Sequence, residues 1–422
     1  MKTIGIDIGT TTISAVVLEY NGKGESGTRK RTIFSRSVQN RSFIQTGREW
    51  ERIQDASVLV KDAKELLDRL LEQYPDVEGI GLTGQMHGVV YVSREGEHVS
   101  PLYTWEDGRG ALADPEEESA VSWIQRRFQI PAATGYGMVT HFYHCRNGRV
   151  PENSTAICTI ADYFGMKLTG RREPLIHAGN AAGLGFYDTE NWRFRKEIIE
   201  AAGMNVGILP EVTDRLEALG DYRGIPVTVA LGDNQASFLG SVGTERETWQ
   251  VNVGTGGQIS VLSEQHFEAP GIEARPFLKR TWLLTGAILC AGRAYAILEQ
   301  FFRSCASAMG LGDTVQYELM NRLAASAAED AGGLEVWTCF QGTRTDPELR
   351  GSICGLSETN FLPENLVLGV LRGIAQEYYG FCQTIYDGTG LRAERLVGSG
   401  GGIRKNPVLQ KIFQDVFHAK LT

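Results

Sequence analysis

Apolar and polar positions repeat along this chain with two different periods, and their alternation predicts an α/β protein. The segment 49–74 has the spacing of an amphipathic helix. Its apolar stripe consists of Ala56, Leu59, Val60, Ala63, Leu66, Leu67 and Leu70. Short apolar runs at 3–8, 13–18, 80–83 and 225–231 have the length of strands instead.

One short pattern occurs twice. The chain reads DIGTTTISAVVL over 7–18 and NVGTGGQISVL over 252–262. In each copy an apolar strand ends in Asp7 or Asn252, makes a Gly-Thr turn and returns as a second strand. Glycine lets a ligand approach the main chain, and turn amides with threonine hydroxyls can hold phosphate oxygens. Two such hairpins predict a nucleotide held between duplicated domains.

The glycine-rich and charged segment 240–247 is the predicted domain boundary, giving domains of 1–243 and 244–422. A second long helix is predicted over 366–386, and a strand-to-glycine motif, VGSGGGIRKNPVLQKIF, follows it. In that motif Asn406 has the character of an N-cap and Pro407 that of a first helical residue.

Length and charge narrow the function classes. A chain of 422 residues has room for two domains or more. A formal net charge of -9 argues against a general nucleic-acid binder, but not against ATP, whose sites use local amides and a metal. Seven scattered cysteines without a CxxC pair favour free thiols in a reducing cytosol. No signal peptide or apolar run of about 20 residues is visible, so we expect a cytoplasmic protein without a membrane partner.

Seven motifs, in order along nearly the whole chain, resemble the FGGY carbohydrate kinases, a branch of the fold that includes actin, hexokinase and the heat-shock chaperones. They are Asp7–Thr12, GLTGQMHG (81–88), PLYTWEDGR (101–109), DYFGMKLTG (162–170), GDNQAS (232–237), Gly254–Gly257 and GGGIRKNP (400–407). Within the family, NAAGLGFYD (180–188), GTRTDPELRGSICGL (342–356) and the TWEDGR wording most resemble sedoheptulokinases.

The resemblance implies two actin/hexokinase-like (ribonuclease H-like) lobes with a cleft between them. The N-terminal lobe would bind sugar and phosphate, and the C-terminal lobe would bind the nucleotide, with ATP and Mg²⁺ as cofactors. FGGY kinases usually continue past the adenosine motif through another strand and an Ala/Gly-rich helix. The C-terminal domain is therefore expected to be short at its end, Thr422.

The catalytic and metal roles fall on two aspartates. The resemblance implies that Asp233, after a predicted buried strand, accepts the proton of the attacking sugar hydroxyl and faces the metal. Asp7 would reach Mg²⁺ through water, since Mg²⁺ keeps several waters. The uncharged Asn252 in the second hairpin suggests a single metal side. The alternatives are structural: Asp233 capping the following helix, and Asp7 serving only its turn.

Nucleotide contacts are expected from the two turns and the glycine motif. The predicted phosphate contacts are Thr10, Thr11, Thr12, Gly254, Thr255 and Gly256. The resemblance places adenosine against Gly401, Gly402 and Asn406. Plain hairpins and a simple loop are the competing interpretations of these segments.

A polyol site needs converging donors and acceptors plus an aromatic or apolar wall. The expected sugar residues are Gln85, Met86, His87, Trp105, Asp107, Asn180 and Asn234. The alternative for Asp107 is a structural ion pair with Arg109. His141 and His144 have a spacing that suits a metal, but the sequence offers no third ligand, which favours a core or surface role.

The predicted function is ATP-dependent phosphorylation of a ketose at a terminal hydroxyl, with sedoheptulose as the expected substrate and its 7-phosphate as the product. One alternative is a kinase for xylulose, ribulose or another polyol. Another, of a different class, is a non-catalytic sugar- or nucleotide-binding sensor, although Asp233 is present and no basic helix-turn-helix segment is visible. The sequence does not set the oligomeric state, although homodimers are common in such families.

Overall fold

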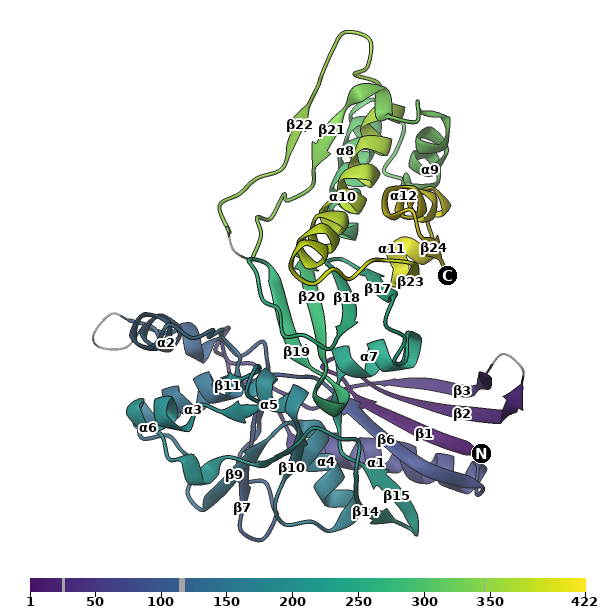
Figure 1. Ribbon diagram of the computed structural model, residues 1–422. Helices are drawn as coiled ribbons and strands as arrows, with labels where there is room; N and C mark the ends of the chain where they lie inside the picture. Colours follow the sequence, from purple (N-terminus) through teal and green to yellow (C-terminus); the bar gives the residue numbers. More distant parts are fainter. Residues whose placement is uncertain (25–26, 114–117, 345) are drawn as a thin grey trace. The chain divides into compact units, whose positions relative to one another are not determined.

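The computed structural model describes residues 1–24, 27–113, 118–344 and 346–422. The chain divides into two compact units. The first contains Met1–Ser237 and Pro276–Arg280, and the second contains Phe238–Arg275 and Thr281–Thr422. Each unit has its own sheet and helices, which confirms the predicted α/β class (Figure 1).

A seven-stranded sheet forms the centre of the first unit. Its order is β14-β15-β6-β1-β2-β3, with β16 pairing β6 beyond the path. The strands are β1 (Lys2–Ile8), β2 (Thr12–Gly24), β3 (Gly27–Gln39), β6 (Val77–Gly84), β14 (Ala218–Tyr222), β15 (Ile225–Thr228) and β16 (Leu231–Gly232). The alternation in β1 buries Ile4, Ile6 and Ile8 in the core, as a period of two requires.

The first predicted hairpin is confirmed, because β1 and β2 pair antiparallel around the turn 9–11. The strand predicted over 225–231 is divided into β15 and β16. Both pair parallel with β6, through Val227 to Ile80 and through Leu231 to Thr83. Leu231 comes four positions after Val227, but its partner Thr83 comes only three positions after Ile80. The pairing with β6 is therefore interrupted between β15 and β16.

Seven helices begin in the first part of the chain. They are α1 (Ala56–Gln73), α2 (Ala120–Phe128), α3 (Gly137–Arg146), α4 (Ile160–Thr169), α5 (Ala178–Leu184), α6 (Lys196–Ala201) and α7 (Asp233–Ser241). A small three-stranded sheet lies among them, formed by β4 (Phe43–Ile44), β5 (Ile53–Gln54) and β8 (Leu102–Tyr103). The two-stranded pairs are β7 (Val90–Ser93) with β9 (Ser154–Cys158), β10 (Leu175–His177) with β13 (Glu211–Thr213), and β11 (Tyr187–Asp188) with β12 (Arg193–Phe194).

Helix α1 corrects the start of the helix predicted at residue 49. Asp55 caps it by accepting hydrogen bonds from the backbone N–H groups of Ser57 and Val58. The residues before the cap include β5, which pairs with β4 and β8. The apolar stripe itself is correct: six of its seven members are buried, and Val60 packs against the same core while partly exposed.

The second unit repeats this arrangement. Its six-stranded sheet has the order β19-β20-β18-β17-β23-β24. The strands are β17 (Thr248–Val253), β18 (Gly257–Ser263), β19 (Ile272–Pro276), β20 (Trp282–Ile288), β23 (Arg395–Ser399) and β24 (Lys420–Leu421). The hairpin β17–β18 is antiparallel, as predicted, and β23 runs parallel to β17. A separate pair joins β21 (Glu335–Trp337) to β22 (Ser352–Cys354).

The helices of the second unit are α8 (Gly292–Ala308), α9 (Tyr317–Ser326), α10 (Pro363–Thr389), α11 (Gly401–Arg404) and α12 (Pro407–Phe417). Helix α10 confirms the second long helix and extends beyond 366–386 at both ends. Pro363 occupies its first turn, and Gly390, with φ of 75°, ends it in the left-handed conformation. All seven cysteines are free thiols, as predicted. Among the described residues, no helix combines the length and apolar character needed to cross a membrane.

Candidate active site

Three parallel strand ends in the first unit bring the predicted catalytic residues together. In the register of β1 and β6, Asp7 lies opposite Thr83. In the register of β6 and β16, Thr83 lies opposite Leu231, two positions before Asp233. Ligands in α/β sheets bind at the carboxyl ends of the strands. Asp7, Gln85 and Asp233 are therefore positioned at one such edge, by pairings that the local sequence does not specify.

The two aspartates interact electrostatically. Burial, the larger cause, and the negative charge of Asp233 together raise the pKa of Asp7 to about 6. Asp233 is the first residue of α7, and its Oδ1 accepts a hydrogen bond of 2.7 Å from the backbone N–H of Asn234. The carboxylate of Asp233 thus lies at the first residue of α7 and interacts electrostatically with Asp7.

Several buried oxygen atoms at this edge have no hydrogen-bond partner among the described residues. They belong to Asp7 (Oδ1), Thr83 (Oγ1), Asn234 (Oδ1) and Gln235 (Oε1). Buried polar atoms are normally paired, and each exception needs an explanation. A polar ligand or a cation bound at the strand ends would satisfy these atoms.

The donor set fits a magnesium ion. Mg²⁺ prefers oxygen ligands, and in nucleotide sites it is held by one or two carboxylates plus water and phosphate oxygens. Asp7 and Asp233 supply the carboxylates, and the unpaired Oδ1 of Asp7 is one acceptor that lacks a partner. Groups of three or more His, Cys, Asp or Glu side chains suited to a metal are absent from the described residues. Among the described residues, the site thus offers two carboxylates to a metal ion and no complete set of protein ligands.

Two amide side chains donate hydrogen bonds to carbonyl oxygens of the first predicted phosphate turn. The backbone N–H of Gly9 donates to the carbonyl of Thr12 over 3.0 Å, and a Cβ on Gly9 would lie 2.9 Å from that same carbonyl oxygen. Asn40 donates to the carbonyl oxygens of Gly9 and Thr10, and Gln54 also donates to Thr10. Sequence analysis missed Asn40 and Gln54, because only long-range packing brings them under the turn.

Trp105 presents a half-exposed indole beside the same turn. Its side chain is 47% exposed, and its Nε1 donates to Thr10 Oγ1 over 2.9 Å. Thr10 Oγ1 in turn donates to Gln85 Oε1, and Gln85 Nε2 donates to Gln54 Oε1. The predicted aromatic wall is therefore hydrogen-bonded to the predicted phosphate turn.

His87 and Met86 follow Gln85 in the chain. His87 has φ of 72°, its ring stacks on Tyr136 with centroids 4.8 Å apart, and its Nδ1 lies 2.8 Å from the carbonyl oxygen of Gly183. Since a carbonyl only accepts, Nδ1 carries the proton in this contact. Met86 is buried, and its sulfur lies 2.4 Å from the position a Cβ on Gly232 would take. Sequence reasoning missed Tyr136, which fixes the imidazole plane.

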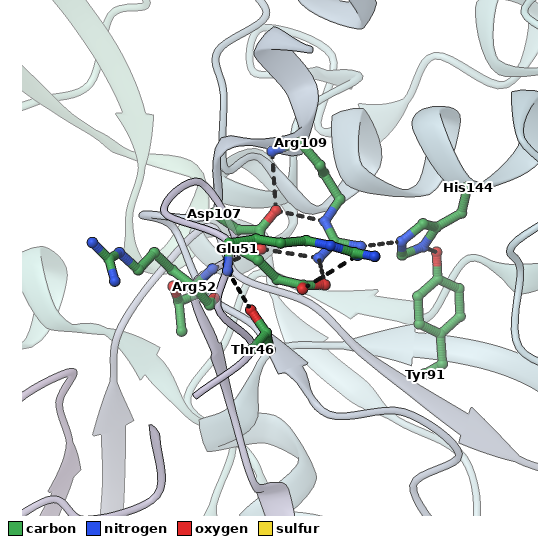
Figure 2. A network of polar contacts seen from close by, with 9 residues as sticks. Thr46, Glu51, Arg52, Tyr91, Asp107, Arg109 and His144 are labelled. Carbon is green, nitrogen blue, oxygen red and sulfur yellow. Dashed lines mark hydrogen bonds and ion pairs between the residues drawn. The ribbon is translucent and has the colours of Figure 1, made fainter. Parts of the chain in front are cut away.

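Asp107 lies in a buried polar network instead of an open site (Figure 2). Its oxygens accept hydrogen bonds from Arg109 and from the backbone N–H of Arg52. Arg109 also contacts Glu51 and His144, whose Nδ1 lies 2.9 Å from the Tyr91 hydroxyl. This is the ion pair that was the alternative for Asp107, so we leave Asp107 out of the proposed sugar site.

Asn180 is likewise enclosed. It is 1% exposed, and its Nδ2 donates to Asp162 and to the carbonyl of Ala230. We leave it out of the sugar site as well. His141 contacts the same tyrosine as His144, because its Nδ1 lies 3.0 Å from the Tyr91 hydroxyl. Burial lowers the pKa of His141 to about 4, which agrees with a neutral histidine in the core.

The second unit contains a cavity of about 510 Å³ at the ends of β17 and β23. Both glycine motifs line it, together with polar residues of α8 and α9. The lining includes Gly254, Thr255, Gly401, Gly402, Lys405 and Asn406. The predicted phosphate turn and adenosine motif are thus brought to one cavity.

Close backbone contacts explain the glycines of this cavity. The backbone N–H of Gly292 donates to the carbonyl of Gly254, and a Cβ on Gly292 would lie 2.4 Å from that oxygen. Gly400 has φ of 87°, and its Cβ would lie 2.4 Å from the carbonyl oxygen of Val253. A Cβ on Gly401 would meet nothing within 4 Å. Asn406 caps α12 by accepting from the backbone N–H of Leu409, as predicted.

Three further residues of this cavity were not predicted. Tyr295 and Tyr317 have ring centroids 5.7 Å apart, and the Tyr295 hydroxyl donates to Asn321 Oδ1 over 2.7 Å. Tyr317 and Asn321 are four residues apart on α9 and so share a face. That spacing is the only signal in the sequence, and it resembles ordinary helix packing.

Comparisons with known proteins cover both units. Residues 2–240 match the N-terminal domain of the FGGY family of carbohydrate kinases, and residues 250–422 match its C-terminal domain. The chain is 27% identical to the sedoheptulokinase of Mus musculus, covering 98% of this chain and 92% of that protein. It is 25% identical to the xylulose kinase of Staphylococcus xylosus, with 99% and 86% covered.

A solved structure shows the same fold. The xylulose kinase of Rhodospirillum rubrum superposes with a TM-score of 0.82 at 21% identity, covering all of this chain and 86% of that one. The two domain matches together account for nearly every residue, including both aspartates and both glycine motifs. This chain therefore belongs to the FGGY family of carbohydrate kinases, which transfer a phosphoryl group to an alcohol.

Proposed function

We propose that this protein phosphorylates a ketose at a terminal hydroxyl with Mg²⁺·ATP, and that its substrate is sedoheptulose, giving sedoheptulose 7-phosphate. The observation that carries the proposal is the set of unpaired buried oxygens beside the aspartate pair. A polyol in water-excluded contact with that edge would supply hydroxyl donors to oxygens that otherwise have none.

In this proposal Asp233 accepts the proton of the attacking hydroxyl. An ordinary carboxylate is a weak base for an alcohol. Phosphoryl transfer has a loose transition state, so catalysis consists mainly of positioning and charge neutralisation. Asp233 begins α7, and its bond to the Asn234 N–H orients it. The same carboxylate therefore positions the hydroxyl and removes its proton.

Asp7 and Asp233 would hold Mg²⁺, which neutralises phosphate charge as it develops. The raised pKa of Asp7, about 6, gives this role a pH dependence. Above that pH both carboxylates are charged and repel each other, and a bound cation relieves the repulsion. Below it a proton on Asp7 competes with the metal.

The sugar would lie against Trp105, with Gln85, Met86, His87 and Asn234 around it. The half-exposed indole offers a flat apolar face, and its N–H is already bonded to Thr10. Asn234 Oδ1 is one of the unpaired acceptors. These groups combine an apolar wall with converging polar atoms, the usual composition of a polyol site.

The nucleotide would occupy the cavity of the second unit. Thr255 and the amides of its turn, which line this cavity, would contact phosphate. In the first unit, Thr10, Thr11 and Thr12 are the proposed phosphate contacts. The adenosine would lie against Gly401 and Gly402, near Asn406. The open space beside Gly401 supports this placement, since nothing of the protein fills it.

Sedoheptulose is proposed over other ketoses because sedoheptulokinases from Mus musculus and Homo sapiens match 98% of the chain at 27% identity. Xylulose kinases match at 25% identity over 99% of the chain and at 26% over 62% of it. A difference this small leaves xylulose and ribulose as the rivals to be tested.

The test is ADP release with Mg²⁺·ATP across sedoheptulose, xylulose, ribulose, glycerol and gluconate, with Asp233→Asn as the control. We expect sedoheptulose to lead in kcat/KM by tenfold or more, a transition-state preference of about 1.4 kcal/mol. If another sugar leads, the kinase assignment stands and the substrate is wrong. If no sugar raises ADP release above the variant, the catalytic proposal is wrong.

A further inference from the structure

A second polar cavity lies in the first unit, away from the residues proposed to bind the sugar substrate. Its volume is about 570 Å³, within the usual range for ligand pockets. The lining includes Tyr187, Trp192, Thr213, Asp214, Arg215 and Arg280. None of the residues that line it belongs to the aspartate pair, the Trp105 wall or the segment 85–87.

A buried hydroxyl without a partner lines this cavity. Tyr187 is 7% exposed, and its hydroxyl has no hydrogen-bond partner among the described residues. The phenol is neutral at ordinary pH, and burial raises its pKa further above its usual value. A neutral phenol can both donate and accept, so Tyr187 keeps an unused donor and acceptor in the wall of this cavity.

His177 adds a second unsatisfied group next to the cavity wall. It is fully buried and lies opposite Thr213 in the parallel register of β10 and β13. Its Nδ1 accepts from the backbone N–H of Gly179, so the neutral ring carries its proton on Nε2. That Nε2 has no hydrogen-bond partner in the part of the chain that the structure describes. A buried donor left unpaired costs free energy that a ligand or water can recover.

The charges of the lining cancel. Arg215 and Arg280 face Asp214 and Glu217 in the same wall. Arg280 Nε donates to Asp214 Oδ2 over 3.1 Å, and Arg215 Nε lies 3.6 Å from Asp214 Oδ1. A formally neutral wall rich in both donors and acceptors does not favour an anion. With the rings of Tyr187 and Trp192 beside it, it matches a molecule with many hydroxyls and an apolar carbon face.

We propose that this cavity, formed around Tyr187, Trp192 and Arg280, is a second binding site for a neutral sugar or polyol. Helix α5 separates it from the proposed substrate site. Ala178, at the start of α5, lines the cavity, and Gly183, near its end, contacts His87 through its carbonyl oxygen. A ligand in the cavity therefore lies one short helix away from a residue proposed to contact the substrate.

The test uses ¹⁹F NMR of the whole chain labelled with 5-fluorotryptophan, which gives at most seven resonances. Trp192→Phe and Trp105→Phe assign the two that matter. Sedoheptulose and, separately, ribitol are titrated in. We expect the Trp192 resonance to shift with its own midpoint, different from that of Trp105. Because each tryptophan reports one site, failure of the substrate proposal would appear at Trp105 and failure of this one at Trp192.

Tyr187→Phe removes one hydroxyl without adding bulk. It should weaken the Trp192 midpoint about 3–10-fold, the usual effect of one neutral hydrogen bond, and leave the Trp105 midpoint unchanged. Tyr222→Phe is the matched control, because the Tyr222 hydroxyl bonds Asp68 in the same unit and lies outside the cavity lining. It should move neither midpoint.

Three results would overturn the proposal. The Trp192 resonance could stay fixed with both probes, which would leave only water in the cavity. The Trp192 resonance could shift with the same midpoint as the Trp105 resonance and be unaffected by Tyr187→Phe. The shift would then be an indirect effect of binding at the substrate site. The Trp192 resonance could respond to sedoheptulose 7-phosphate but to neither neutral probe, which would contradict a neutral ligand.

Discussion

The two sheets share one arrangement of strands, but the residues at the ends of these strands differ. In the first unit β1 pairs antiparallel with β2 and parallel with β6, and in the second β17 pairs antiparallel with β18 and parallel with β23. The hairpin position held by Asp7 in one sheet is held by Asn252 in the other. Asp7 has an unpaired buried oxygen, whereas the backbone carbonyl of Asn252 accepts from the Tyr378 hydroxyl.

The difference extends to the segments that follow the parallel strands. After β6 comes Gln85, with side chains that can bind hydroxyls, and after β23 come Gly400, Gly401 and Gly402, which have none. The same strand arrangement therefore presents polar and charged side chains in the first unit and mainly backbone atoms in the second. The comparison indicates how a repeated architecture can divide the sugar and the nucleotide between its copies.

Asp233→Asn should have the largest effect on this division. Losing the proton acceptor should lower kcat by about 10²–10⁴-fold, the usual range for general-base catalysis. Sugar affinity, and ATP affinity measured without Mg²⁺, should change little, since the amide keeps the shape of the side chain. Steady-state kinetics and calorimetry measure the two quantities; an unchanged kcat would remove Asp233 as the base.

Gly401→Leu tests the second unit. The added side chain has no protein atom to meet within 4 Å of its Cβ and should fill the nucleotide cavity. We expect the ATP KM to rise about 100-fold, roughly 2.7 kcal/mol of lost binding, while sugar affinity stays the same. Gly380→Leu is the matched control, an exposed glycine on α10 whose Cβ would also meet nothing. Unchanged ATP affinity in Gly401→Leu would move the nucleotide elsewhere.

Trp105→Ala should act on the sugar alone. Losing the indole face should raise the sugar KM by about tenfold, or about 1.4 kcal/mol, with a much smaller change in the ATP KM. Trp337→Ala provides a control in the second unit, since that indole is 62% exposed. Equal changes in both KM values for Trp105→Ala would place this residue outside the sugar site.

The raised pKa of Asp7 should make the stability of the protein depend on pH, whereas Asn252 at the matching position of the second hairpin does not titrate. Its folded pKa, about 6, lies above the ordinary 3.8, so the folded state holds the proton more tightly than the unfolded state. Stability should therefore fall as pH rises from 3.8 toward 6 and stay low above it. Asp7→Asn should remove this loss and raise Tm near neutral pH by a few degrees, roughly 1–3 °C.

Magnesium sharpens the same measurement. Millimolar Mg²⁺ should raise Tm of the wild type more above the pKa of Asp7 than below it, and should not raise Tm of Asp7→Asn. Thermal melts at several pH values, with and without Mg²⁺, provide the comparison. A Mg²⁺ effect that is independent of pH, or that survives Asp7→Asn, would mean that Asp7 does not face the metal.

Tyr378→Phe should have the smallest effect. It removes the 2.6 Å hydrogen bond to the carbonyl of Asn252, at a cost of about 0.5–1.5 kcal/mol of stability. We expect ATP affinity to fall by a few-fold at most, because the phosphate turn loses one support. Denaturant unfolding with nucleotide titration would show whether stability falls while sugar affinity does not; a loss of sugar affinity would contradict the assignment.

Sequence patterns predicted the features that local chemistry determines. The two glycine hairpins, the apolar stripe of α1 and the cap at Asn406 all depend on residues near one another in the chain. The start of α1 was wrong because Ile53 and Gln54 pair with strands that the pattern does not reveal.

The site was harder to predict where burial decides whether a polar residue can contact a ligand. Asp107 and Asn180 are polar residues within family motifs, but their partners, Arg52 and Asp162, become visible only in the folded chain. Asn40, Gln54 and Tyr136 support the site from distant segments and have no local signature.

The division of ligands between the two units is tested most directly by hydrogen–deuterium exchange of the intact chain with one ligand at a time. Sedoheptulose alone should slow exchange around Gln85–His87 and Asp233. A non-hydrolysable Mg²⁺·ATP analogue alone should slow it around Gly254–Gly256 and 401–406. A sugar footprint confined to the second unit, or a nucleotide footprint that spares both glycine motifs, would contradict the account.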